Sequence, residues 1–200
     1  MLNFNGVDIP EFVRVKAVNI SALPSINTNL KGSMAGFGVL SGKTSFDEKT
    51  ITASIIIIVP EGYTLQKCAR ELAVWLKGND FGLSPLIIKD DADIRYMAKL
   101  SSSVDLSDLI YAGEGEIEFV VPSGCGESIS EKSVTGTPKA SINYSGSQRA
   151  FPTIEITVGG TASTVTVNHV QKGNSVFLNG SFKSGDKIFI DCSKHLIKVN

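Results

Sequence analysis

The chain has 200 residues, of which 42% are hydrophobic and 20% are charged. This balance is typical of a folded globular protein and excludes an intrinsically disordered chain. The formal net charge is −1, and the 19 Lys and Arg residues are scattered, which argues against a protein that grips nucleic acid through its phosphates. The three cysteines lie far apart and form no CxxC motif, so we expect neither a disulfide framework nor a zinc site.

The termini and the apolar runs give no sign of export or membrane insertion. Residues 1–6 lack a basic segment followed by an apolar one, as a signal peptide would have. The longest apolar run, Ile55–Val59, is far too short to cross a bilayer. We therefore expect a reduced, cytosolic protein without a membrane contact.

The first sixty residues predict extended structure. Residues 12–17 alternate as a strand does, with Val13 and Val15 on one side. Residues 21–45 are rich in Gly, Ser and Asn, which is typical of a long hairpin arm or a mobile loop. Residues 51–59 are β-branched and almost entirely apolar, and they predict a strand that is buried on both faces.

One helix is expected, directly after that strand. Its apolar residues recur at spacings of three and four, which places them on one face: Leu65, Cys68, Ala69, Leu72, Trp75 and Leu76. Thr64 is suited to cap the start, and Gly78 to end the helix. Such a stripe more often packs against a sheet than it binds a cofactor, so we expect a packed helix.

The remainder of the chain predicts short strands and one linker. Strands are expected at 86–88 and 95–100, joined by a tight turn at 90–93, and at 116–121. Residues 123–148 are rich in Gly, Ser, Thr and Lys, which is typical of a linker. Five further strands are then expected, at 153–158, 163–170, 175–178, 187–191 and 195–199, with turns between them that include Asn179-Gly180. This order predicts a mainly β (α+β) protein with domains at 1–125 and 151–200 and a linker at 126–150.

No catalytic, cofactor or metal site emerges from the motifs. Ser41-Gly42-Lys43-Thr44 resembles the end of a P-loop, but the required earlier glycine is replaced by Phe37. The aspartates at 90, 91 and 93 fail the spacing of an EF-hand, which needs a glycine and a glutamate at fixed later positions. His169 and His195 have no partner at a recognisable spacing. We therefore expect no enzyme, no cofactor and no metal.

The most regular charged pattern is an acidic row. Glu114, Glu116 and Glu118 alternate with Gly115, Ile117 and Phe119, so an extended chain places the three carboxylates on one face. Paired carboxylates carry out glycoside hydrolysis when they flank a bond, but neighbours along one strand point the same way. The pattern therefore indicates the solvated outer face of a half-buried strand.

The order of the segments resembles the distal tail proteins of bacteriophages with long, non-contractile tails. The matching pieces, in chain order, are Phe4–Asp8, Val18–Pro24, the strand and helix at 51–76, the hairpin at 86–100, the strand at 115–122, the linker, and the strand containing Gly185–Asp191. Each piece is weak alone, and their order and spacing carry the resemblance. Family chains usually continue for several strands beyond such a last segment, so the final domain is expected to be truncated.

The resemblance implies an architecture and a set of partners. It implies an N-terminal sandwich or split barrel with one packed helix, a C-terminal galectin-like sandwich, and a homohexameric ring in the virion tail. The ring would join the tail tube protein, the tape measure protein and a tail-associated tip protein, and DNA would pass without specific binding. We expect Phe4, Val13, Val15 and Phe37 at subunit contacts, and the row Glu114, Glu116 and Glu118 at the lumen. The alternative is a carbohydrate-binding module for attachment to the host surface.

Overall fold

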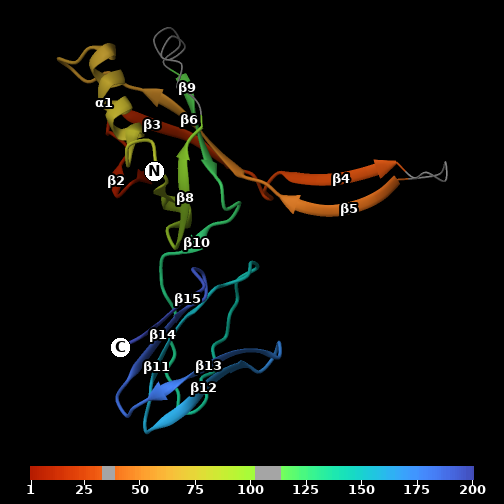
Figure 1. Ribbon diagram of the computed structural model, residues 1–200. Coiled ribbons are helices and arrows are strands. Elements are labelled where there is room, and N and C mark those ends of the chain that lie inside the picture. The colour runs from red at the N-terminus through yellow and green to blue at the C-terminus, as the bar shows by residue number, and fades with distance from the viewer. Residues whose placement is uncertain (33–38, 102–113) are drawn as a thin grey trace. The chain divides into compact units, whose positions relative to one another are not determined.

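The structure is a computed structural model that describes residues 1–32, 39–101 and 114–200 (Figure 1). The chain divides into two compact units, residues 1–141 and residues 142–200. The division falls inside the segment 126–150 that the sequence predicts as a linker. Each unit has its own hydrophobic core, so each is described by itself.

Unit 1 is an open, mainly antiparallel sheet with one helix. Its elements are β1 (Leu2–Phe4), β2 (Val7–Asp8), β3 (Val13–Ile20), β4 (Ile26–Gly32), β5 (Val39–Phe46), β6 (Lys49–Ile57), α1 (Leu65–Lys77), β7 (Ser84–Ile88), the 3₁₀ turn η1 (Lys89–Asp91), β8 (Ile94–Leu100), β9 (Glu114–Val121) and β10 (Glu127–Ser128). The main sheet has the order β2-β1-β7-β8-β9-β6-β3, and β10 pairs with β8. The strands β4 and β5 form a separate hairpin.

The connection between β2 and β3 forces this sheet to curl. These two strands are the opposite edges of the sheet, yet the five steps from Asp8 to Val13 span at most about 18 Å. In a flat sheet, six strand spacings would separate the edges by about 29 Å. The sheet therefore bends until its edges approach, and the buried side chains of Ile9 and Phe12 in the connection (3% and 8% exposed) join the core.

The core of unit 1 is organised around three aromatic rings. Phe4, Trp75 and Phe119 come from β1, α1 and β9, and their ring centroids lie 5.1 to 6.5 Å apart in tilted and edge-to-face arrangements. Such arrangements place the positive ring edge against the negative face of the neighbour. The indole Nε1 of Trp75 also donates a hydrogen bond to the carbonyl oxygen of Val7 at 2.9 Å. The helix is therefore fixed both to the sheet and to its edge strand β2.

The helix forms where the sequence predicts it. The Thr64 hydroxyl accepts a hydrogen bond from the amide of Lys67, and Gly78 ends the helix with a positive φ of 52°. The buried face consists of Cys68, Ala69, Leu72, Trp75 and Leu76. Leu65, the first residue of the stripe, is partly buried against the same core.

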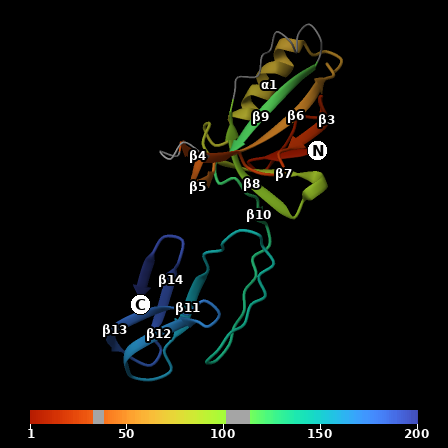
Figure 2. The same cartoon turned by 90° about the vertical axis from the view of Figure 1, so that its right-hand side faces the viewer.

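The long polar stretch before β6 is a hairpin arm. Its strands β4 and β5 pair antiparallel from Ile26 with Phe46 at the base to Gly32 with Val39. Figure 1 shows this arm projecting from unit 1 beyond the main sheet, and Figure 2 shows it nearly end-on. Of the two alternatives left by the sequence, the hairpin is therefore confirmed for the described part of this segment.

Unit 2 consists of two small sheets that face each other across a narrow core. Its strands are β11 (Thr153–Thr157), β12 (Ala162–His169), β13 (Asn174–Phe182), β14 (Lys187–Asp191) and β15 (Leu196–Val199). One sheet has the order β11-β14-β15, and the other is the hairpin β12-β13. Its buried side chains are Val158, Phe182, Ile188 and Ile190. This core is much smaller than that of unit 1.

The turn predicted at Asn179-Gly180 is wrong, because β13 continues through both residues to Phe182. A strand that stopped at Leu178 would leave the Phe182 ring, which is 5% exposed, outside the core. The ring also lies close to Gly180, where an added Cβ would be 3.2 Å from it. Packing of one aromatic side chain thus overrides a strong local turn signal.

The expected fold class, mainly β with one packed helix, is confirmed, and the described sheets of both units are open. The short strands β1, β2 and β10 were not predicted, whereas the other described strands of the main sheet and of unit 2 lie at or near their predicted positions. In the part of the chain that the structure describes, no helix is long and apolar enough to cross a membrane.

The helix packing gives a direct stability test. The change Leu72→Ala removes a side chain that is 0% exposed, and we expect it to lower the free energy of unfolding of unit 1 by about 2–5 kcal/mol. The matched change Val74→Ala lies on the same helix but at a position that is 74% exposed, so its effect should stay within about 0.5 kcal/mol. Urea unfolding followed by tryptophan fluorescence measures both, and equal effects would contradict the assigned helix face.

The turn before β15 predicts a pH-dependent local stability. The Asp191 carboxylate accepts hydrogen bonds from the Ser193 hydroxyl at 2.6 Å and from the amides of Ser193 and Lys194 at 3.0 and 3.1 Å. These bonds, that of the Ser193 hydroxyl first, hold the pKa of Asp191 below its ordinary value of 3.8. A lowered pKa contributes stability that is present above the ordinary value and is lost as the pH falls through the folded value.

We therefore expect Asp191→Asn to reduce hydrogen-exchange protection of the β15 amides at neutral pH. The difference from the wild type should start to shrink as the pH falls below 3.8 and should vanish once the pH is below the lowered pKa of Asp191. Glu131→Gln, at an exposed carboxylate of the linker, is the control and should change nothing. A difference that persisted unchanged in acid would show that the Asp191 charge does not stabilise this turn.

Candidate functional site

The predicted acidic row lies on the outer face of β9, the face that points away from the core. Ile117 and Phe119 are 0% exposed on the inner face, whereas Glu116 is exposed and Glu118 is half-buried. Glu114 begins the same strand, opposite Ile56 of β6, and its side chain lies outside the described residues. The predicted division of this strand into an inner and an outer face is therefore confirmed at its described side chains.

β6, which pairs with β9, and β3, which pairs with β6, extend this face with small and mostly polar side chains. Glu118 lies opposite Thr52 and Glu116 opposite Ser54 on β6. On β3, Asn19 pairs with Thr52 and Ala17 with Ser54. The outer face of β9, β6 and β3 at these positions is therefore a hydrophilic surface with carboxylates along one strand, and we call it the acidic face.

Three of the residues predicted at subunit contacts point into their own subunit. Phe4 is 2% exposed and Val13 is 5% exposed. Side chains buried this deeply offer no area to a neighbour, so the prediction for these two is corrected to a core role. Val15 lies opposite Ile55 and is half-buried against the same core, and Phe37 lies outside the described residues. The alternating apolar residues Val13 and Val15 of β3 therefore pack against the core of unit 1 and do not indicate a contact with another subunit.

The backbone of β3 and the base of the arm are surfaces that sequence reasoning did not single out. β3 is an edge of the main sheet, so one side of its backbone has no strand partner within the described chain. At the base of the arm, Ile26 and Phe46 are directly opposite each other and are 52% and 61% exposed. A cross-strand apolar pair left in water is typical of a segment that packs against another molecule.

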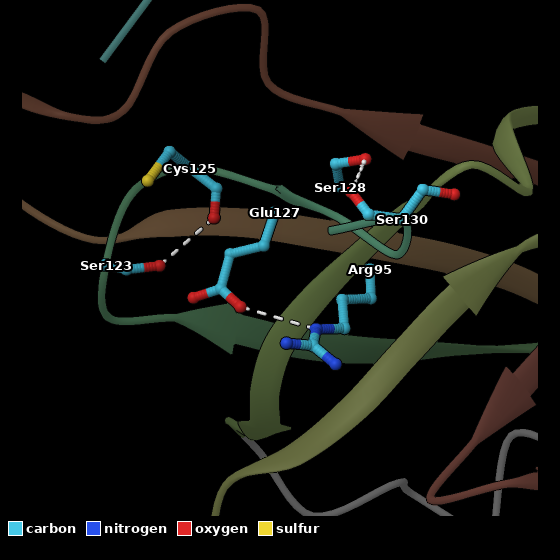
Figure 3. A network of polar contacts seen from close by, with 6 residues as sticks. All are labelled: Arg95, Ser123, Cys125, Glu127, Ser128 and Ser130. Atoms are coloured by element: carbon cyan, nitrogen blue, oxygen red, sulfur yellow. Dashed lines mark hydrogen bonds and ion pairs between the residues drawn. The ribbon is translucent and has the colours of Figure 1, made fainter. Parts of the chain in front are cut away.

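A polar cluster fixes the start of the linker to unit 1 (Figure 3). The Arg95 guanidinium donates from Nε to the Glu127 carboxylate at 3.3 Å, which ties β10 to β8. The hydroxyls of Ser123 and Ser128 donate to the carbonyl oxygens of Cys125 and Ser130, at 3.1 and 3.2 Å. Both partners of the ion pair are about half exposed, so this cluster orients the segment more than it stabilises the fold.

Close backbone approach at Gly126 explains how the linker can begin there. A Cβ at this position would lie 2.4 Å from Cγ2 of Ile94 and 2.9 Å from the Tyr96 ring. Only glycine therefore fits between β10 and β8 without moving them. Burial raises the pKa of the Tyr96 hydroxyl, and the nearby Asp91 charge adds to the shift.

Comparison with known proteins agrees with this geometry. Residues 7–121 match the family described as phage tail protein RIFT-related domain, and residues 145–200 match that of the siphovirus-type tail component, C-terminal domain. The fold resembles the crystal structure of SPP1 Dit (gp 19.1), described as a paradigm of the hub adsorption apparatus in phages that infect Gram-positive bacteria. The TM-score is 0.79 at 12% identity, over 99% of this chain and 81% of that chain. No curated protein matches the sequence.

The acidic face predicts a contrast between neighbouring positions of β9. Because the side chains of Glu116 and Glu118 point away from the core, Glu116→Gln and Glu118→Gln should change the free energy of unfolding by no more than about 0.5 kcal/mol each. Ile117→Ala, between them, should lower it by about 2–5 kcal/mol. Urea denaturation measures all three, and a large loss at either glutamate would mean that its carboxylate supports the fold.

Proposed function

We propose a tail-hub role for this chain on the premise that it belongs to the family of phage tail proteins with the RIFT-related domain. The chain is a distal tail protein of the siphophage type, a structural component of the virion tail. In the proposed role, six copies form a ring that joins the tail tube protein to the baseplate or tip proteins. The tape measure protein and a tail-associated tip protein are its further neighbours, and the chain is made in the cytoplasm of the bacterial host.

The observation that supports the proposed ring is the edge strand β3 of unit 1, which has no strand partner on its outer side within the described chain. A head-to-tail ring needs two different surfaces on each subunit that fit each other. The side of β3 that has no strand partner within the described chain can accept a strand, and the arm carries the exposed pair Ile26 and Phe46 away from its own core. An arm that buries this pair on the next copy would remove apolar surface from water at every contact in the ring.

The acidic face suits the wall of a channel through which DNA passes. A basic wall would release counterions from the phosphates and bind DNA tightly, which would slow its passage. Glu116 and Glu118 offer carboxylates, and Ser54 and Thr52 opposite them offer small hydroxyls. We therefore place this face toward the lumen of the proposed ring.

The proposed role is structural and requires no catalytic activity of the chain. The family is one of structural tail components, and the motifs of the sequence give no catalytic constellation. The chain would act through its shape: unit 1 as the ring, and unit 2 as a module attached through the segment that starts at β10.

The ring predicts a defined mass in solution. Six copies of the 21.3 kDa chain give about 128 kDa, which native mass spectrometry separates easily from a monomer, and negative-stain images should show a central hole. The double change of Ile26→Ser and Phe46→Ser should shift the population toward monomers, because it removes the apolar pair at the base of the arm. Val74→Ser, at an exposed apolar position of the helix, is the matched control and should leave the mass unchanged.

A strict monomer at every accessible concentration, alone and with the tail tube protein, would contradict the ring. Binding of unit 2 to a glycan array would then favour the carbohydrate-binding module instead.

A further inference from the structure

The arm leaves unit 1 at a break in the strand ladder. The pairing of β3 with β6 ends at Ile20, and the pairing within the arm starts at Ile26. The five residues between them lie opposite only four on the returning strand, residues 47–50. An extra residue on one strand bends it locally, so continuous strand pairing does not fix the direction of the arm.

A turn from another part of the sheet packs against both sides of this break. β9 ends at Val121, and the amide of Gly124 donates to the Val121 carbonyl oxygen at 3.0 Å, which closes the turn. Gly124 is buried. A Cβ at this position would lie 3.0 Å from the carbonyl oxygen of Asp47 and 3.0 Å from Cγ of Pro24. Because Pro24 and Asp47 belong to the two opposite sides of the break, the turn contacts both sides.

Two separate demands select glycine at position 124. The backbone adopts a positive φ of 68°, which glycine accepts most readily. The second demand is space, because the nearest atoms belong to a backbone carbonyl and to a proline ring, and neither can swing aside as the end of a long side chain can. Gly62 meets only the first demand: its φ is 79°, and an added Cβ would have no neighbour within 4 Å among the described residues. The two glycines therefore separate the backbone requirement from the packing requirement.

The same turn also starts the linker. Residues 122–126, which we call the Gly124 turn, lead directly into β10. Gly126 fits closely against β8, and Glu127 forms the ion pair with Arg95 (Figure 3). The Gly124 turn thus contacts the base of the arm at one residue and β8 two residues later. A displacement at either end therefore shifts one short, closely packed segment.

We propose that the Gly124 turn fixes the direction of the arm and ties the arm to the start of the linker. Gly124 is a positioning residue in this role, since its close approach to Pro24 and Asp47 leaves the base of the arm no room to tilt toward the turn. β4 has seven residues and is about 23 Å long, so a small tilt at the base becomes a larger displacement farther out. The consequence for assembly rests on the proposed function, because the arm must carry Ile26 and Phe46 to the next copy.

A distance within one chain tests the direction of the arm. Spin labels on ketone-bearing non-natural residues at position 44 of β5 and position 74 of α1, both exposed, leave the cysteines untouched. The labelled chain is diluted into unlabelled protein, so pulsed electron paramagnetic resonance reads distances within single chains. Gly124→Ala should shift or broaden the distance distribution, because the added Cβ pushes against Pro24 and Asp47. Gly62→Ala is the matched control and should leave the distribution as in the wild type.

Hydrogen exchange tests the tie to the linker from the other end of the turn. At the base of the arm, the Ser25 amide donates to the Glu48 carbonyl oxygen at 3.1 Å, and the Asp47 amide donates to that of Ser25 at 2.8 Å. Gly126→Ala would push a Cβ into Ile94 of β8 and displace the turn. It should therefore raise the exchange rates of the Ser25 and Asp47 amides by roughly two- to ten-fold, as expected when a backbone hydrogen bond weakens.

The reciprocal change should act in the opposite direction. The Ile129 amide, directly after β10, donates to the Asp93 carbonyl oxygen at 2.9 Å. Gly124→Ala should raise the exchange rate of this amide by a similar factor, because a shift of the turn loosens β10. Gly62→Ala should change neither the Ile129 amide nor the base of the arm. Urea unfolding of every variant verifies that unit 1 remains folded.

The outcomes separate this role from the ring itself. A changed distance distribution in Gly124→Ala but not in Gly62→Ala, together with both crossed exchange effects, supports the proposal. Native mass spectrometry should then show fewer assembled copies for Gly124→Ala than for Gly62→Ala. An unchanged distribution overturns the positioning role, and exchange effects confined to the mutated side overturn the tie to the linker. If the wild type itself is monomeric, the ring is contradicted, and the distance measurement still decides the role of Gly124.

Discussion

The short connection between β2 and β3 is the constraint on which the structure of unit 1 depends. Because so few residues join the two outermost strands, the sheet must curl, and the curl creates an inside and an outside. The inside receives the helix and the ring cluster of Phe4, Trp75 and Phe119. The outside carries polar side chains, including Glu116 and Glu118, beside some apolar ones. The acidic face and the free edge at β3 are both consequences of a sheet that bends without closing.

The two units differ in the size of their hydrophobic cores and in the apolar surface that they leave exposed. Unit 1 has an extensive core, and its edge strand β3 has no outer strand partner within the described chain. Unit 2 has four buried side chains, and apolar rows of its larger sheet reach the edge. Since stability scales with the apolar area removed from water, unit 2 gains proportionally more from a neighbour than unit 1 does.

Patterns that depend on local periodicity could be predicted from the sequence. The helix followed from the spacing of its stripe, and the acidic face followed from the alternation of Glu116 and Glu118 with buried residues. β1 and β2 are too short to show a period, and Phe182 extends β13 through a turn signal for the sake of distant packing. Strand order decides which strands are edges, and no local pattern encodes it. For this reason the sequence alone does not distinguish the buried Phe4 and Val13 from contact residues.

The linker that starts at Gly126 limits how far unit 2 can lie from that point, and its length therefore sets the local concentration of unit 2. About 24 residues, 129–152, separate β10 from β11, and a flexible chain of that length has an r.m.s. span of about 27 Å. Copies of unit 2 anchored by such tethers around one ring would experience each other at roughly millimolar effective concentration. A contact between copies of unit 2 whose dissociation constant lies below that concentration would then be occupied most of the time, and it would be lost at lower protein concentration once the tethers were cut.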